Sequence, residues 1–152
     1  MRPTKTIAVT ILSAMICSAS ASAGEMTDSR QLVELPKNIE SKMLINMRDH
    51  IAALDDIIAA VHVDKYDKAA DIAESRLGWS SLVRRGDQDV TKHWAAPMQK
   101  MADSMYRAAS NFVIVAQDAS VEETKESYKK VIGSIQKITT ACRGCHGVFR
   151  VR

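Results

Sequence analysis

The chain has 152 residues and a formal net charge of +3, and 26% of its residues are charged. This length allows one domain with a hydrophobic core and is short for two. Two of the positive charges, Arg2 and Lys5, stand in an N-terminal segment that we expect to be removed, so the remaining chain carries about +1. A charge this small does not indicate nucleic-acid binding.

Residues 1–23 have the layout of a secretory signal peptide. The basic residues Arg2 and Lys5 precede an apolar run from Ile7 to Ile16, and Ala21-Ser22-Ala23 supplies small residues for cleavage. The apolar run is too short to span a bilayer permanently, although a retained membrane anchor is the alternative. We therefore expect cleavage after Ala23, an exported, periplasmic protein of residues 24–152, and no membrane span after cleavage.

The mature chain reads as all-α. Apolar residues recur at steps of three and four, while prolines and glycines are few. We expect helices over 36–61, 64–77 with Asp64 as N-cap, about 95–116, and from a capping box at Ser120 and Glu123 to Cys142, with a polar linker over 78–94. Four helices of this length with short turns predict an antiparallel four-helix bundle as a single domain.

The most informative motif is CRGCH, in which Cys142 and Cys145 stand three apart and His146 follows directly. On a helix these side chains share one face, so two thiols can reach the two vinyl groups of a haem while the imidazole coordinates its iron. The alternatives are weaker. A redox-active dithiol normally begins a helix after a strand, a structural zinc site needs more ligands, and a disulfide between these cysteines is strained. The motif therefore predicts one covalently bound haem c with His146 as proximal iron ligand.

The ending CRGCHGVFR resembles that of the class II cytochromes c, the cytochrome c′ family. The matching residues are Cys142, Cys145, His146, Phe149 and Arg150, and the HWAAP stretch is similar to the segment before the family's third helix. The resemblance extends over essentially the whole mature chain. It implies a four-helix bundle, a haem near the C-terminus, and a second axial position that faces the first helix.

The resemblance makes the first helix decisive for function, because a methionine there gives a six-coordinate electron carrier and an apolar residue leaves the iron open to gases. Met43 and Met47 lie on the apolar stripe and are the candidates for the distal iron ligand, with Met43 first. His50 is a third candidate. The register of the family falls on Leu44, which would leave the position vacant.

We therefore expect an electron carrier, not an enzyme, with His/Met ligation of a low-spin iron. The alternative is a five-coordinate protein that binds nitric oxide or carbon monoxide. A haem enzyme such as a peroxidase would need a distal acid–base pair, for which only His50 with Asp49 or Asp55 is available.

Unknown redox proteins are the expected partners. A homodimer is a further expectation, for which Ile58, Val61 and Ile72 offer apolar contacts that fit a core equally well. Basic residues gather by sequence around the motif and suit haem propionates or an acidic partner: Lys129, Lys130, Lys137, Arg143, Arg150 and Arg152.

Overall fold

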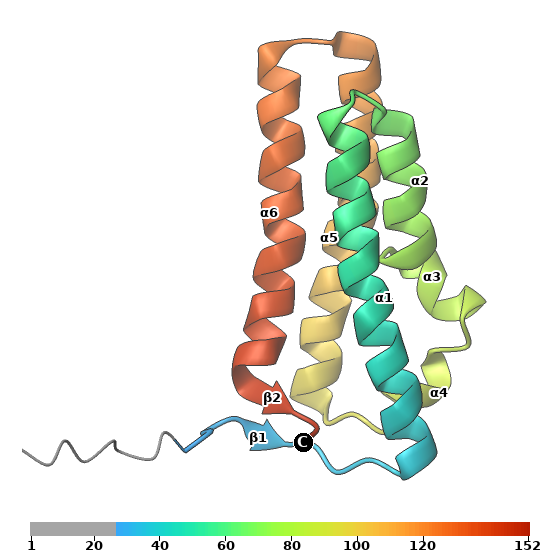
Figure 1. Ribbon diagram of the computed structural model, residues 1–152, viewed down its shortest axis with the longest axis vertical. Helices are drawn as coiled ribbons and strands as arrows, with labels where there is room; N and C mark the ends of the chain where they lie inside the picture. The colour runs from blue at the N-terminus through green and yellow to red at the C-terminus, as the bar shows by residue number, and fades with distance from the viewer. Residues whose placement is uncertain (1–26) are drawn as a thin grey trace, which may run out of the picture.

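The computed structural model describes residues 27–152, so the expected signal peptide of residues 1–23 lies outside the described residues. The described chain is mostly helical, as predicted, and the long helices α1, α5 and α6 pack together (Figure 1). Shorter helices lie between α1 and α5 in the sequence. The helices are α1 (Lys37–His62), α2 (Tyr66–Arg76), α3 (Trp79–Arg84), α4 (Gln88–Thr91), α5 (Ala96–Glu122) and α6 (Lys125–Val148).

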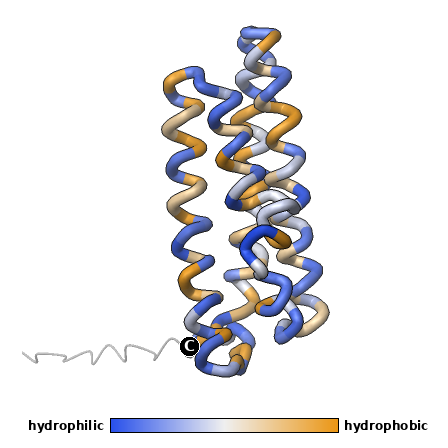
Figure 2. Tube along the Cα trace, turned by 90° about the vertical axis from the view of Figure 1, so that its right-hand side faces the viewer, coloured by the Kyte–Doolittle hydropathy of each residue, from blue (hydrophilic) through white to orange (hydrophobic). Residues whose placement is uncertain are grey.

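The main core forms where α2 packs against α1 and α5, and α5 against α6. Apolar and polar residues alternate along each long helix, as Figure 2 shows, and this gives each helix one buried face. Phe112, Ile57 and Val131 are fully buried in this core, as their spacing predicted. Many of the remaining core positions are alanines, which allow the helix backbones to approach closely.

The turn between α5 and α6 differs from the prediction at Ser120. The predicted capping box at Ser120 and Glu123 is wrong, because Ser120 lies inside α5, which continues to Glu122 with Ala116 and Ala119 still facing the core. Glu123 ends the helix in the left-handed conformation, with φ at 47°. Thr124 is the actual N-cap of α6, where it forms a reciprocal capping box with Ser127.

The start of α2 also differs from the prediction. Asp64 is not the N-cap, because its φ of 58° places it in the preceding turn and Lys65 occupies the cap position. The Asp64 carboxylate instead accepts a hydrogen bond of 3.0 Å from the hydroxyl of Tyr66.

The linker predicted over 78–94 contains α3 and α4. Buried Ser81 and Val90 hold these two short helices against the rest of the molecule.

Two short strands were not predicted. Strand β1 (Gln31–Leu32) pairs in parallel with β2 (Phe149–Arg150), which directly follows α6. The amide of Val33 extends the pairing with a hydrogen bond of 2.8 Å to the carbonyl of Arg150. The segment before α1 is thus attached beside the C-terminus, at one end of the molecule (Figure 1). The strands were missed because two residues are too few to show a strand period.

A second apolar cluster lies at this end of the molecule. Its buried members come from the N-terminal segment, α1, α4, α5 and β2: Val33, Met43, Val90, Trp94, Met98 and Phe149. Ile58 is half exposed on α1, whereas Val61 and Ile72 pack against the main core. Over residues 27–152, no helix combines the length and apolar character needed to cross a membrane.

Candidate functional site

A largely apolar cavity of about 530 Å³ lies between α1, α5 and the last turns of α6. This volume falls within the range of about 300–1,000 Å³ that is typical of cofactor and small-molecule sites. Its walls carry five methionines and several aliphatic and aromatic side chains, with a few polar groups at the edges. The lining residues include Met43, Leu44, Met47, His50, Trp94, Met98, Tyr106, Cys142, Cys145, His146, Phe149 and Arg150.

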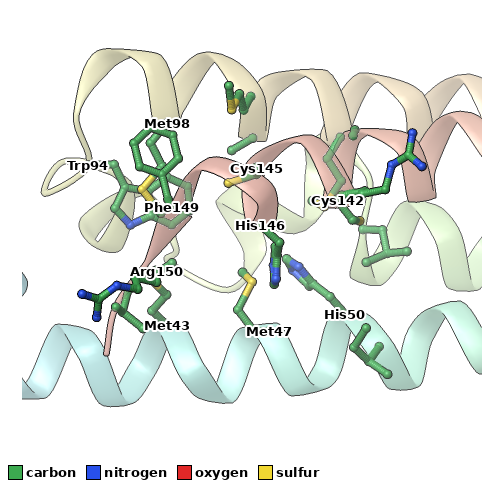
Figure 3. A pocket seen from close by; sticks show the side chains of 18 of the residues that line it. Met43, Met47, His50, Trp94, Met98, Cys142, Cys145, His146, Phe149 and Arg150 are labelled. Carbon is green, nitrogen blue, oxygen red and sulfur yellow. The ribbon is translucent and has the colours of Figure 1, made fainter. Parts of the chain in front are cut away.

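The whole CRGCH motif opens on this cavity. Cys142, Cys145 and His146 all line it, and all three come from the last turns of α6 (Figure 3). Their spacing of three and four positions places them on one helix face, as predicted. The helix continues past the motif to Val148, and the Phe149 amide then donates to the Cys145 carbonyl. The motif is therefore presented on a rigid helix end.

The thiols of Cys142 and Cys145 are free and half-buried. Burial raises the pKa of both thiols above its usual value, and the neighbouring Cys142 adds to the rise at Cys145. Redox-active dithiols normally have the opposite property, a thiolate stabilised by nearby positive charge. Thiols with a raised pKa are poorly suited to repeated oxidation and reduction. They are better suited to a single covalent reaction while the protein is assembled.

The candidates on α1 separate in space. Met43 packs in the second apolar cluster, near Trp94, Phe149 and Arg150 (Figure 3). Met47 lies further along the helix, beside the imidazole of His146. The cavity thus brings Met47, but not Met43, next to the proposed proximal histidine. This placement does not support the prediction that Met43 is a better ligand candidate than Met47.

His50 is buried, with 9% of its surface exposed, and its imidazole points toward that of His146 (Figure 3). Burial, followed by the positive charge of Arg85, lowers the pKa of His50 to about 4. Arg85 is held nearby because it pairs with Asp49, whose carboxylate also accepts a hydrogen bond of 3.1 Å from Arg76. The hydrogen bond from Arg76 is the main cause of the lowered pKa of Asp49. His50 is accordingly neutral at ordinary pH.

Two buried hydrogen-bond donors at the other end of the cavity have no partner within residues 27–152. They are the indole Nε1 of Trp94 and the guanidinium Nε of Arg150. The Nε of Arg150 forms an ion pair with the carboxylate of Asp28 at 3.6 Å, which is too long for a hydrogen bond. Burying a hydrogen-bond donor without an acceptor costs free energy. These two donors therefore indicate that a bound group supplies an acceptor at this site. Phe149 packs in the same region, with 5% of its surface exposed.

The predicted basic residues divide into two groups. Arg143, Arg150 and Arg152 line the cavity, whereas Lys129, Lys130 and Lys137 are exposed elsewhere on α6.

The sequence analysis missed Arg30 and Tyr106, which also line the cavity. Tyr106 is 3% exposed, and burial followed by the charge of Asp87 raises its pKa to about 12. No sequence signal marks Arg30, because only the pairing of β1 with β2 brings it to this site.

Within the described part of the chain, no group of three or more His, Cys, Asp or Glu side chains is arranged to hold a metal ion. Comparisons of the chain with protein-family models, with curated proteins and with solved structures find no match.

Proposed function

We propose that this protein is an exported, single-haem c-type cytochrome that carries electrons. One observation carries the proposal: both thiols and the imidazole of CRGCH open together on one apolar cavity that faces α1. In this proposal the helices form an antiparallel four-helix bundle of the class II cytochrome type. The periplasm is the proposed location, because haem attachment to this motif takes place outside the cytoplasm.

The residues present fit a haem. Cys142 and Cys145 would each add sulfur and hydrogen across one vinyl group, which forms a thioether without net oxidation, and His146 would coordinate the iron. The unpaired donors of Trp94 and Arg150 suit the propionate carboxylates. When bound, the haem supplies reversible one-electron exchange between ferric and ferrous iron. The apolar walls would reduce the contact of the haem with water, and this would limit the reorganisation that each electron transfer requires.

The side chains that α1 presents to the cavity determine whether the iron would have a second protein ligand. This in turn decides between the two candidate functions. A donor from this face makes the protein a low-spin electron carrier, and among the methionines Met47 is better placed than Met43 for His/Met ligation. A second candidate function, binding of nitric oxide or carbon monoxide, follows if no side chain coordinates there. The apolar residues Leu44, Ile51 and Leu54 on the same wall favour that alternative.

The exposed cationic groups near the cavity are the proposed contact for redox partners. Arg143 and Arg152 line its edge, and both are exposed. Charges at such an edge steer an acidic partner and raise association rates more than affinity.

The test is expression of the full chain with a haem-attachment system, followed by denaturing electrophoresis with haem staining. Covalent haem is expected in the native chain and not in the Cys142→Ala/Cys145→Ala variant. Visible spectra in both oxidation states, with and without carbon monoxide, then separate the two functions. A chain that is exported and folded but carries no covalent haem contradicts the proposal. A ferrous spectrum that shifts with carbon monoxide favours gas binding over electron transfer.

A further inference from the structure

His50 and His146 occupy facing positions on opposite walls of the cavity. His146 comes from the last turns of α6 and His50 from the middle of α1, and their imidazoles point toward one another in Figure 3. Both residues line the same cavity.

The imidazole of His50 is free to act as a ligand. Within residues 27–152, neither of its ring nitrogens makes a hydrogen bond. In its neutral form, one ring nitrogen of the imidazole carries an available lone pair.

The other side chains of the α1 wall are less suited to this role. Met43 is 7% exposed and fills the second apolar cluster with Trp94 and Met98. Met47 lies beside His146, but it also packs against that cluster, and its flexible thioether is a common filler of irregular space. The neighbouring Asp49 pairs with Arg76 and Arg85, which ties this part of α1 to the ends of α2 and α3.

We infer that His50 is the second axial ligand of the iron, opposite His146. This bis-histidine assignment rests on the proposed function, and it replaces a thioether with an imidazole on the distal side. Two consequences follow. The coordinated iron is low-spin and closed to carbon monoxide, and its reduction potential is lower than methionine ligation would give, because thioether ligands raise the potential.

The experiment compares three variants of the full, exported chain, His50→Ala, Met47→Ala and Met43→Ala, after haem staining has confirmed covalent haem in each. The readouts are the electron paramagnetic resonance spectrum of the ferric form, carbon monoxide binding by the ferrous form, and the reduction potential. Only His50→Ala is expected to convert the iron to high spin and open it to carbon monoxide. Added imidazole should return the low-spin signal in that variant, which a purely structural role of His50 does not predict.

The assignment is overturned if Met47→Ala or Met43→Ala produces the high-spin form while His50→Ala remains low-spin. It is also overturned if the native protein already binds carbon monoxide. A His50→Met variant covers the case in which alanine prevents folding, because methionine keeps a long side chain in the cavity. Its low-spin iron should have a raised potential, and an unchanged potential refutes the assignment. Absence of covalent haem from the native chain is a different result, which contradicts the proposed function itself.

Discussion

Arg30 donates a hydrogen bond of 3.3 Å from its Nη1 to the carbonyl oxygen of His146, although 116 positions of sequence separate the two residues. The contact places the segment before α1 directly on the CRGCH turn. Pairing of β1 with β2 and the burial of Val33 in the second apolar cluster support the same arrangement. The N-terminal segment therefore packs against the end of α6 and stabilises it, and this end carries His146, the proposed proximal ligand.

Removing the buried contact of this segment should destabilise the protein. Val33 is 8% exposed and Leu32 beside it is 44% exposed, so the two offer a matched pair. Val33→Ala should lower the free energy of unfolding by about 2 kcal/mol, from lost apolar burial and the space left behind. Leu32→Ala should change it by less than about 0.5 kcal/mol. Urea denaturation followed by circular dichroism measures both, and equal effects would contradict the stabilising role of this segment.

The unpaired donor of Trp94 should matter only when the haem is present. Trp94→Phe removes the indole Nε1 and keeps an aromatic ring, so the holoprotein should lose about 1–3 kcal/mol of stability if this donor binds a propionate. The same substitution in the haem-free Cys142→Ala/Cys145→Ala background should be close to neutral. Thermal unfolding of the four proteins provides the comparison. A loss of the same size in both backgrounds would assign Trp94 to packing alone.

The buried imidazole of His50 should make the haem-free protein sensitive to mild acid. Its pKa is about 4 in the folded state against 6.5 for the free side chain, so the unfolded chain binds more protons between these values. Stability therefore falls as the pH is lowered from about 6.5 to about 4, by up to about 3 kcal/mol.

A His50→Leu variant in the same Cys142→Ala/Cys145→Ala background should lose this slope. Acid effects of carboxylates such as Asp49, whose pKa is lowered, appear at lower pH and remain in both proteins. Urea midpoints measured across pH 4–7 give the two profiles. Parallel profiles would show that His50 is more accessible to solvent than its burial indicates.

Two neighbouring glutamates at the end of α5 should respond oppositely to glycine. Glu123 has a φ of 47°, which costs a residue with a Cβ roughly 1 kcal/mol. Glu123→Gly should therefore stabilise the protein by about 0.5 kcal/mol, after the greater entropy of the unfolded chain is subtracted. Glu122→Gly, still within the helix, should destabilise it by about 0.5–1 kcal/mol. Chemical denaturation measures both changes, and a loss of stability in both variants would contradict the strain at Glu123.

The sequence predicted the helical content, the buried stripes of the long helices and the common face of Cys142, Cys145 and His146. These features depend on local periodicity, which a chain shows directly. Helix boundaries were less predictable at Ser120 and Asp64. Several residues near each of these turns have side chains suited to capping, and the choice among them depended on which residues the core keeps buried.

The arrangement of the cavity depends on the tertiary structure. The spacing on α1 places Met43, Met47 and His50 on one stripe, and the sequence favoured Met43, then Met47, with His50 third. Packing against Trp94 and Phe149 draws Met43 into an apolar cluster, and the position of α6 along α1 brings His50 opposite His146. Arg30 joins the site only through β1. The sequence by itself thus determined that Cys142, Cys145 and His146 share one helix face, because the helix repeat brings them together. Only the tertiary structure decided which side chains face that motif. These contacts join segments that are far apart in the sequence, and local periodicity does not determine how such segments pack against one another.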